Sequence, residues 1–247
     1  MSRSILAMAL LFACAGPALA AEDATCDPSV FAADIQAAGL AHVAKVESDG
    51  RLHFSADSRG RPCPAVACSL RAYVLKGDEL LTGRRLGAWR CAWFKPRAPQ
   101  SGFGSVGWLR DDALTPVPFA ASPALSAWVG RWVRDRPFGL ETSLNVRPAP
   151  GGRLKVKGSS LFAHSRADVD RGAVNDGEID DVVDVHGRLA GLLIPGPRGA
   201  SRSMEPETYK FECRFGMALL GDRLFVADDT ACGGLNVSFT GVYRRER

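Results

Sequence analysis

The stretch DDTACGGLNVSFTGVY, residues 228–243, decides how this chain folds, because it joins a cysteine to a glycine pair and an alternating apolar run. Cys232 could be a reactive thiol, a metal ligand or half of a disulfide. The two glycines after it allow backbone angles that other residues avoid. Val237 and Phe239, continued by Gly241, alternate with polar residues and predict the inward face of a final strand.

Residues 1–20 have the organisation of a signal peptide. A positive charge at Arg3 precedes an apolar run too short to span a bilayer, and the segment closes on Ala-Leu-Ala at Ala20. We therefore expect cleavage after Ala20 and a periplasmic or secreted protein. The alternative is a lipoprotein lipidated at Cys14. No later stretch is long and apolar enough for stable membrane insertion.

Six cysteines follow the leader, and an even number in an exported chain predicts three disulfides. The C-terminal half contains only Cys213 and Cys232, which must pair there; the bridge closes a loop of 18 residues and should stabilise the fold by roughly 3 kcal/mol. Three pairings are open to the other four cysteines. We favour Cys68 with Cys91, and Cys26 with Cys63. No close cysteine pairs at zinc spacing occur, and the four histidines are scattered, so no metal is expected.

A linker is predicted at residues 116–125, where three prolines remove backbone donors and favour extended geometry. It separates an N-terminal domain with a helical lead-in, residues 21–115, from a C-terminal domain, residues 126–247. Four of the six cysteines precede the linker and two follow it, so each domain can close its own bridges.

The N-terminal domain opens with one short helix and continues with strands. Asp27 and Pro28 suit a helix start, and Gly39 ends the regular part. The strand signals that follow are short and separated by glycine-containing turns, which is typical of a small barrel. They fall at 52–54, 70–75, 79–82, 88–94 and 105–109.

Residues 68–115 resemble a bacterial SH3-like domain. Gly77-Asp78 matches the turn after the family's first strand, a tryptophan-containing strand follows, and Gly107-Trp108-Leu109 matches the last strand. Such domains bind cell-wall peptides or serve as spacers. The resemblance therefore implies binding in the envelope and nothing catalytic.

A ligand surface in this domain is predicted around the loop at residues 95–105. Strand alternation places Trp89, Cys91 and Trp93 on one face and Phe94 on the other. The two tryptophans are interpreted as core residues, because a disulfide at Cys91 would bury their face. The candidate binding residues are Phe94, Arg97, Phe103 and Trp108.

The C-terminal domain contains eight strand signals at regular intervals and almost no helical periodicity. This pattern predicts an antiparallel up-and-down barrel or a sandwich, so that the whole protein is all-β. The signals lie at 127–134, 140–147, 153–159, 173–185, 188–194, 207–219, 222–227 and 235–245.

Two resemblances belong to this domain. Gly130-Arg131-Trp132 and the closing Tyr243-Arg244-Arg245 resemble lipocalin-like barrels. The W-x-G-x-W pattern from Trp128, the Y-x-x-x-C near match at 209–213 and the ending C-G-G-x-x-V-x-F-x-G-x-Y from Cys232 resemble C-terminal domains of uncharacterised proteobacterial envelope proteins. Some of those domains accompany modules of the lysozyme-inhibitor type, so inhibition is implied only by association.

The acidic stretch at residues 166–185 fails as a calcium loop, because three of the four tested ligand positions lack an oxygen-bearing side chain. An exposed hairpin turn at Asn175-Asp176-Gly177 is predicted instead. Glu178, Asp180 and Asp184 would then lie on the solvent side of a strand.

No nucleophile elbow, P-loop or zinc-protease motif is present in the sequence. A net charge of +4 without a basic patch disfavours nucleic-acid binding. The leading hypothesis is a secreted, non-catalytic envelope protein that binds peptidoglycan or a protein, with no cofactor. The alternatives are an inhibitor of a lysozyme-like hydrolase, which needs an exposed loop able to plug a cleft, and an enzyme of unknown type.

Overall fold

The computed structural model describes residues 25–36, 40–95, 102–118, 123–135, 137–191 and 213–246. The predicted leader, Cys14 and Arg97 lie outside these residues. Within them, no helix has the length and apolar character needed to span a membrane.

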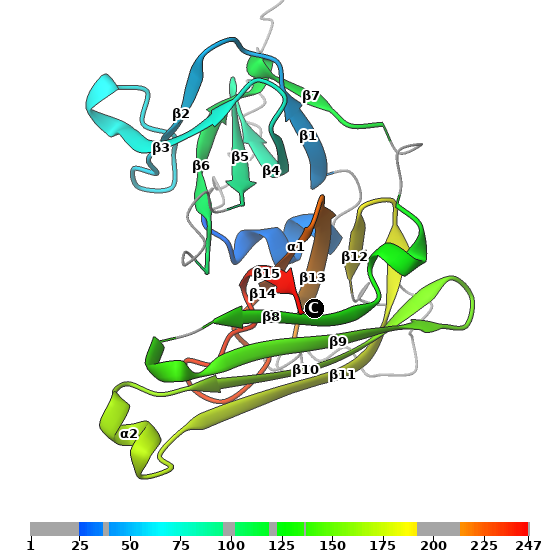
Figure 1. Ribbon diagram of the computed structural model, residues 1–247. Coiled ribbons are helices and arrows are strands. Elements are labelled where there is room, and N and C mark those ends of the chain that lie inside the picture. Colours follow the sequence, from blue (N-terminus) through cyan, green and yellow to red (C-terminus); the bar gives the residue numbers. More distant parts are fainter. Residues whose placement is uncertain are drawn as a thin grey trace, which may run out of the picture.

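Eight antiparallel strands form a closed barrel, which confirms the predicted strand number and selects the barrel over the sandwich. Every strand pairs with its neighbours in the chain, and the first strand closes against the last, as Figure 1 shows. The last strand is shorter than predicted, because residues 235–240 form a loop. The strands are β8 (Gly130–Asp135), β9 (Glu141–Ala149), β10 (Arg153–Phe162), β11 (Asn175–His186), β12 (Leu189–Gly191), β13 (Phe215–Leu220), β14 (Arg223–Asp228) and β15 (Gly241–Arg245).

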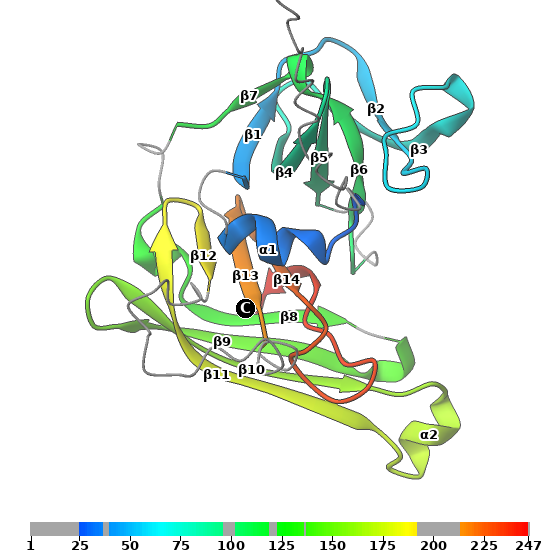
Figure 2. The same ribbon diagram turned by 180° about the vertical axis from the view of Figure 1, so that it is seen from behind.

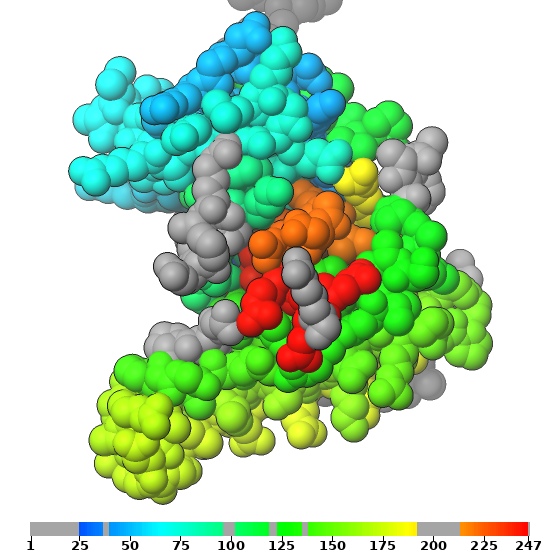
Figure 3. Space-filling model, viewed as in Figure 1, coloured from blue at the N-terminus to red at the C-terminus, as the bar shows by residue number. Residues whose placement is uncertain are grey.

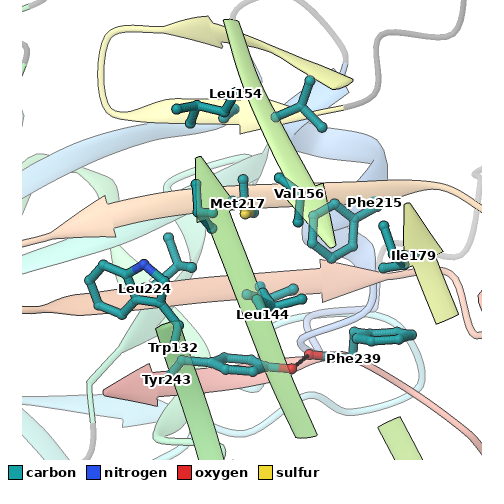
Figure 4. Close-up of a cluster of buried hydrophobic side chains, with 14 of the residues drawn as sticks. Trp132, Leu144, Leu154, Val156, Ile179, Phe215, Met217, Leu224, Phe239 and Tyr243 are labelled. Carbon is teal, nitrogen blue, oxygen red and sulfur yellow. Dashed lines mark hydrogen bonds between the residues drawn. The ribbon is translucent and has the colours of Figure 1, made fainter. Parts of the chain in front are cut away.

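The barrel interior is filled by side chains that alternate along the strands. On β9, Leu144 and Val146 point inward and are fully buried, whereas Asn145 between them is exposed. Figure 4 shows Phe239 entering this core from the loop before β15, with its carbonyl accepting a hydrogen bond of 2.6 Å from the Tyr243 hydroxyl. The loop therefore contributes to the core.

A second sheet of seven strands makes up the N-terminal half. Its order is β3-β2-β6-β5-β4-β1-β7, so the hairpin formed by β2 and β3 lies at one edge. The strands are β1 (His42–Val46), β2 (Arg51–Ser55), β3 (Ser69–Leu75), β4 (Glu79–Leu86), β5 (Trp89–Phe94), β6 (Ser105–Arg110) and β7 (Leu114–Pro116). Single-turn 3₁₀ helices lie at η1 (Val66–Cys68), η2 (Asp111–Ala113), η4 (Leu125–Ala127) and η5 (Pro137–Gly139).

The helix α1 (Val30–Gln36) lies between the second sheet and the outer wall of the barrel (Figure 2). Phe31 of α1, Trp93 of β5 and Phe225 of β14 belong to one buried cluster. The Trp93 ring meets Phe225 edge-on at 5.2 Å between centroids. The two halves therefore share a hydrophobic core across α1, in addition to their own interiors.

The disulfides confirm the predicted Cys213–Cys232 bridge and correct the other two pairs. Cys26 pairs with Cys91, and Cys63 pairs with Cys68. Cys91 belongs to the buried cluster around α1, and Cys26 lies four residues before that helix begins, which brings their Cα atoms to 5.4 Å. Docking of α1 therefore determines this pairing, and the preferred Cys68–Cys91 and Cys26–Cys63 bridges were wrong.

The predicted turn at Asn175-Asp176-Gly177 is also wrong, because these residues begin β11 and pair with the end of β10. The connection is instead made by the short helix α2 (Arg166–Asp170). Gly177 serves close packing, since a Cβ atom there would lie 2.8 Å from the Cys232 carbonyl oxygen. Glu178 and Asp180 are exposed, as predicted.

Candidate functional site

One end of the barrel is closed by its own aromatic and basic residues. The 3₁₀ helix η4 lies there, and Arg245 donates a hydrogen bond to the Ala127 carbonyl. The Arg245 guanidinium stacks 4.7 Å from the centroid of the Trp132 ring, and the Trp132 indole donates to the Trp128 carbonyl at 2.8 Å. The candidate site lies at the opposite end of the barrel.

At the opposite end, the inner layer of the barrel is polar. Thr142 and Ser160 are buried and lie 3.0 Å apart, oxygen to oxygen. The carbonyl of Ser238, in the loop between β14 and β15, accepts hydrogen bonds from the Ser160 hydroxyl at 3.1 Å and from the guanidinium of buried Arg134 at 3.1 Å. The loop at 229–240 is thereby fastened over the mouth of the barrel.

Asp228 holds this loop from the strand side. Its carboxylate is fully buried at the end of β14 and accepts hydrogen bonds from the Ser238 hydroxyl at 2.6 Å, the Phe239 N–H at 3.0 Å and the Thr240 N–H at 3.2 Å. The Thr240 hydroxyl also donates to it. A charged acceptor with four donors fixes the loop conformation strongly. The Cys213–Cys232 bridge fixes the other end of the same loop.

An open cleft of about 1000 Å³ lies beside this loop. Leu235 is 75% exposed at the cleft, and its carbonyl accepts a 2.7 Å hydrogen bond from the Asn175 side chain. The cleft is lined by Phe162, His164, Asp229, Thr230, Ala231, Gly233, Gly234, Leu235, Asn236, Val237 and Ser238.

Two lining residues adopt an unusual backbone conformation. Thr230 has φ of 66° and Asn236 has φ of 63°, in the left-handed region that non-glycine residues rarely occupy. The strain belongs to β-branched Thr230, because asparagine tolerates this region. Such strain persists only where surrounding contacts enforce it, and it concentrates at ligand sites. The disulfide and the Asp228 hydrogen bonds supply the enforcing contacts here.

Another part of the cleft lining is an edge-to-face aromatic pair that precedes the short helix α2. The ring of His164 lies edge-on to Phe162 at 4.9 Å between centroids. The Ser165 hydroxyl, followed by the charges of Arg171 and His164, holds the pKa of Asp168 below its usual value. The cleft thus offers an aromatic wall, an exposed leucine and side-chain oxygen and nitrogen atoms, which suit a ligand with both polar and apolar faces.

The residues predicted as a binding surface do not come together as one. Phe94 and Trp108 are both buried, because both faces of the N-terminal sheet are covered. Phe94 packs in a core cluster made by that sheet alone, and Trp108 packs in the cluster around α1. Phe103 is 52% exposed, with the Arg134 guanidinium 5.0 Å from its ring centroid. Its carbonyl accepts a 2.6 Å hydrogen bond from the Trp93 indole of the same half, whereas the contact with Arg134 of β8 joins it to the barrel.

The cleft residues were missed by the sequence analysis for an identifiable reason. Residues 235–240 alternate like a strand, and that pattern conceals a loop whose Val237 and Phe239 are buried while Leu235 is exposed. The one sequence signal for a loop is Asn236, a residue type that tolerates positive φ.

No group of three or more histidine, cysteine, aspartate or glutamate side chains is placed to hold a metal ion within the described part of the chain. Fold and site together define an all-β protein in which a closed eight-stranded barrel carries an open cleft at one end. No family model, curated protein or solved structure matches this chain.

Proposed function

We propose that this protein is a non-catalytic binding protein of the cell envelope and that the cleft beside the 229–240 loop holds its ligand, peptidoglycan. The observation that carries the proposal is the fixed cleft itself, whose strained loop is held by a disulfide and by buried Asp228. A preformed site loses little conformational entropy when its ligand binds.

The chemistry of the cleft supports a ligand of this class. Peptidoglycan combines sugar rings, which have apolar faces and hydroxyl edges, with short peptides. The Phe162 and His164 rings and the exposed Leu235 side chain can contact apolar faces, while Asn236 and Asp229 can bond hydroxyl or amide groups.

Two further observations support a location in the cell envelope. The three disulfides fit an oxidising, extracytoplasmic space. The resemblance of residues 68–115 to bacterial SH3-like domains, which bind cell-wall peptides or serve as spacers, favours the same location.

Sedimentation with purified sacculi tests the proposal. The mature, oxidised protein should sediment with sacculi, and Leu235→Asp should weaken this by about tenfold or more, because it places a charge on the apolar part of the cleft. Val66→Asp is the matched control, since Val66 is also highly exposed but lies in the other half of the chain. Failure of the wild-type protein to sediment would contradict peptidoglycan as the ligand.

A further inference from the structure

Val66 is the most exposed large hydrophobic side chain among the described residues, at 91%. It lies in the loop between β2 and β3, inside the six-residue ring that the Cys63–Cys68 disulfide closes, hereafter the Val66 loop (residues 63–68). Single exposed apolar residues are common on protein surfaces. An apolar residue at the tip of a cross-linked loop is different, because its position is fixed toward solvent.

Hydrogen bonds hold the Val66 loop on both sides. The Cys63 N–H donates to the Ala56 carbonyl at 3.1 Å, and the Ala56 N–H donates to the Cys68 carbonyl at 2.9 Å. Within the ring, the Cys68 N–H donates to the Ala65 carbonyl at 2.9 Å. The Ser55 hydroxyl also donates to the Cys63 carbonyl. The loop is therefore preorganised and would lose little conformational entropy on binding.

The surroundings of the Val66 loop are cationic. Arg59 and Arg61, four and two residues before Cys63, are exposed, and neither forms an ion pair within the described part of the chain. Asp57 is the acidic neighbour, but its oxygens accept hydrogen bonds from backbone N–H groups of Cys26 at 2.8 Å and Arg61 at 3.1 Å. The two guanidinium groups are thus available to a partner.

The loop is also sterically accessible. In Figures 1 and 3 the connection between β2 and β3, drawn in cyan, projects sideways from the upper half of the molecule. A large protein could reach the Val66 loop without contacting the barrel cleft. The loop and the cleft are therefore independent surfaces.

We propose that the Val66 loop inserts into the substrate cleft of a lysozyme-like glycoside hydrolase and inhibits it. Such clefts are concave and contain a pair of carboxyl groups about 5–10 Å apart. A cross-linked, hydrogen-bonded loop with an exposed apolar residue suits such a cleft, and Arg59 and Arg61 complement the carboxylates. This function does not depend on the barrel cleft or on its ligand.

Inhibition assays with c-type and g-type lysozymes test the proposal. The oxidised mature protein should inhibit at least one of them, with stronger inhibition at low ionic strength because the arginines contribute. Val66→Asp should raise the inhibition constant about tenfold or more, and Arg59→Glu combined with Arg61→Glu should do the same at low salt. Leu235→Asp is the matched control and should inhibit like the wild-type protein.

All of these side chains are exposed, so each variant should keep the wild-type melting temperature. Lack of inhibition of both lysozymes, or inhibition unaffected by Val66→Asp, would overturn the proposal. Sacculus sedimentation by the same proteins separates the two functions: Val66→Asp should still sediment, whereas Leu235→Asp should still inhibit.

Discussion

Replacing Asp228 with asparagine tests whether the cleft loop is held as the structure indicates. The side chain keeps its size but loses its charge, and one acceptor oxygen becomes an NH₂ donor. One oxygen, Oδ1, accepts from Ser238 and Thr240, and the other, Oδ2, accepts from the Phe239 N–H at 3.0 Å. The least damaging orientation keeps the amide oxygen at Oδ1 and turns the NH₂ group toward the Phe239 N–H.

In that orientation one charge-assisted hydrogen bond is lost, and two donors face each other in a fully buried site. A hydrogen bond to a charged group contributes about 1.5–3 kcal/mol, and leaving a buried group unsatisfied costs about 1–3 kcal/mol. Because these contributions overlap, we expect Asp228→Asn to lower the free energy of unfolding by roughly 2–4 kcal/mol.

Denaturant unfolding with the disulfides intact measures the change, and hydrogen exchange of the 229–240 amides locates it. Asp229→Asn is the neighbouring control and should cost less than about 1 kcal/mol, because that carboxylate is partly exposed and pairs with Arg214 only at 4.0 Å. A loss below about 0.5 kcal/mol in Asp228→Asn, with unchanged exchange in the loop, would refute the reasoning.

Three other substitutions probe the rest of the fold. Phe239→Ala should lower the free energy of unfolding by roughly 3–5 kcal/mol by emptying the barrel core, and a loss under about 1 kcal/mol would contradict that packing. Asp34→Ala removes the buried partner of Arg84 and should cost about 3 kcal/mol in the same assay. Burial, followed by the charge of Arg90, lowers the pKa of His42 in the folded protein. The free energy of unfolding should therefore fall as the pH drops below about 6.5, the pKa of histidine in the unfolded chain. The fall should be smaller in His42→Gln, and an identical pH dependence of stability in the two proteins would exclude this role.

The barrel could be predicted from the sequence because each strand produces a local alternation of apolar and polar residues. Each of the eight alternating segments overlaps an observed strand, and the even cysteine count in the second half leaves Cys213 and Cys232 only one pairing. The polar sides of β11 follow the same alternation, as exposed Glu178 and Asp180 show.

The sequence-based predictions fail where packing between segments that are distant in the sequence determines the structure. The Cys26–Cys91 bridge depends on where α1 docks, which no local pattern contains. Gly177 looked like a turn residue, but it is required because the Cys232 segment packs against it. Trp108 looked like a binding residue, because the sequence does not reveal that α1 and the barrel cover the second face of its sheet.

Mapping the ligand on the protein by NMR tests the central claim most directly. Isotopically labelled mature protein would be titrated with soluble peptidoglycan fragments while backbone amide shifts are followed. We predict that the shifts concentrate at residues 229–238, together with Phe162 and His164, which line the cleft. Shifts confined to the N-terminal sheet, or no shifts at saturating fragment, would contradict the assignment of this cleft as the peptidoglycan site.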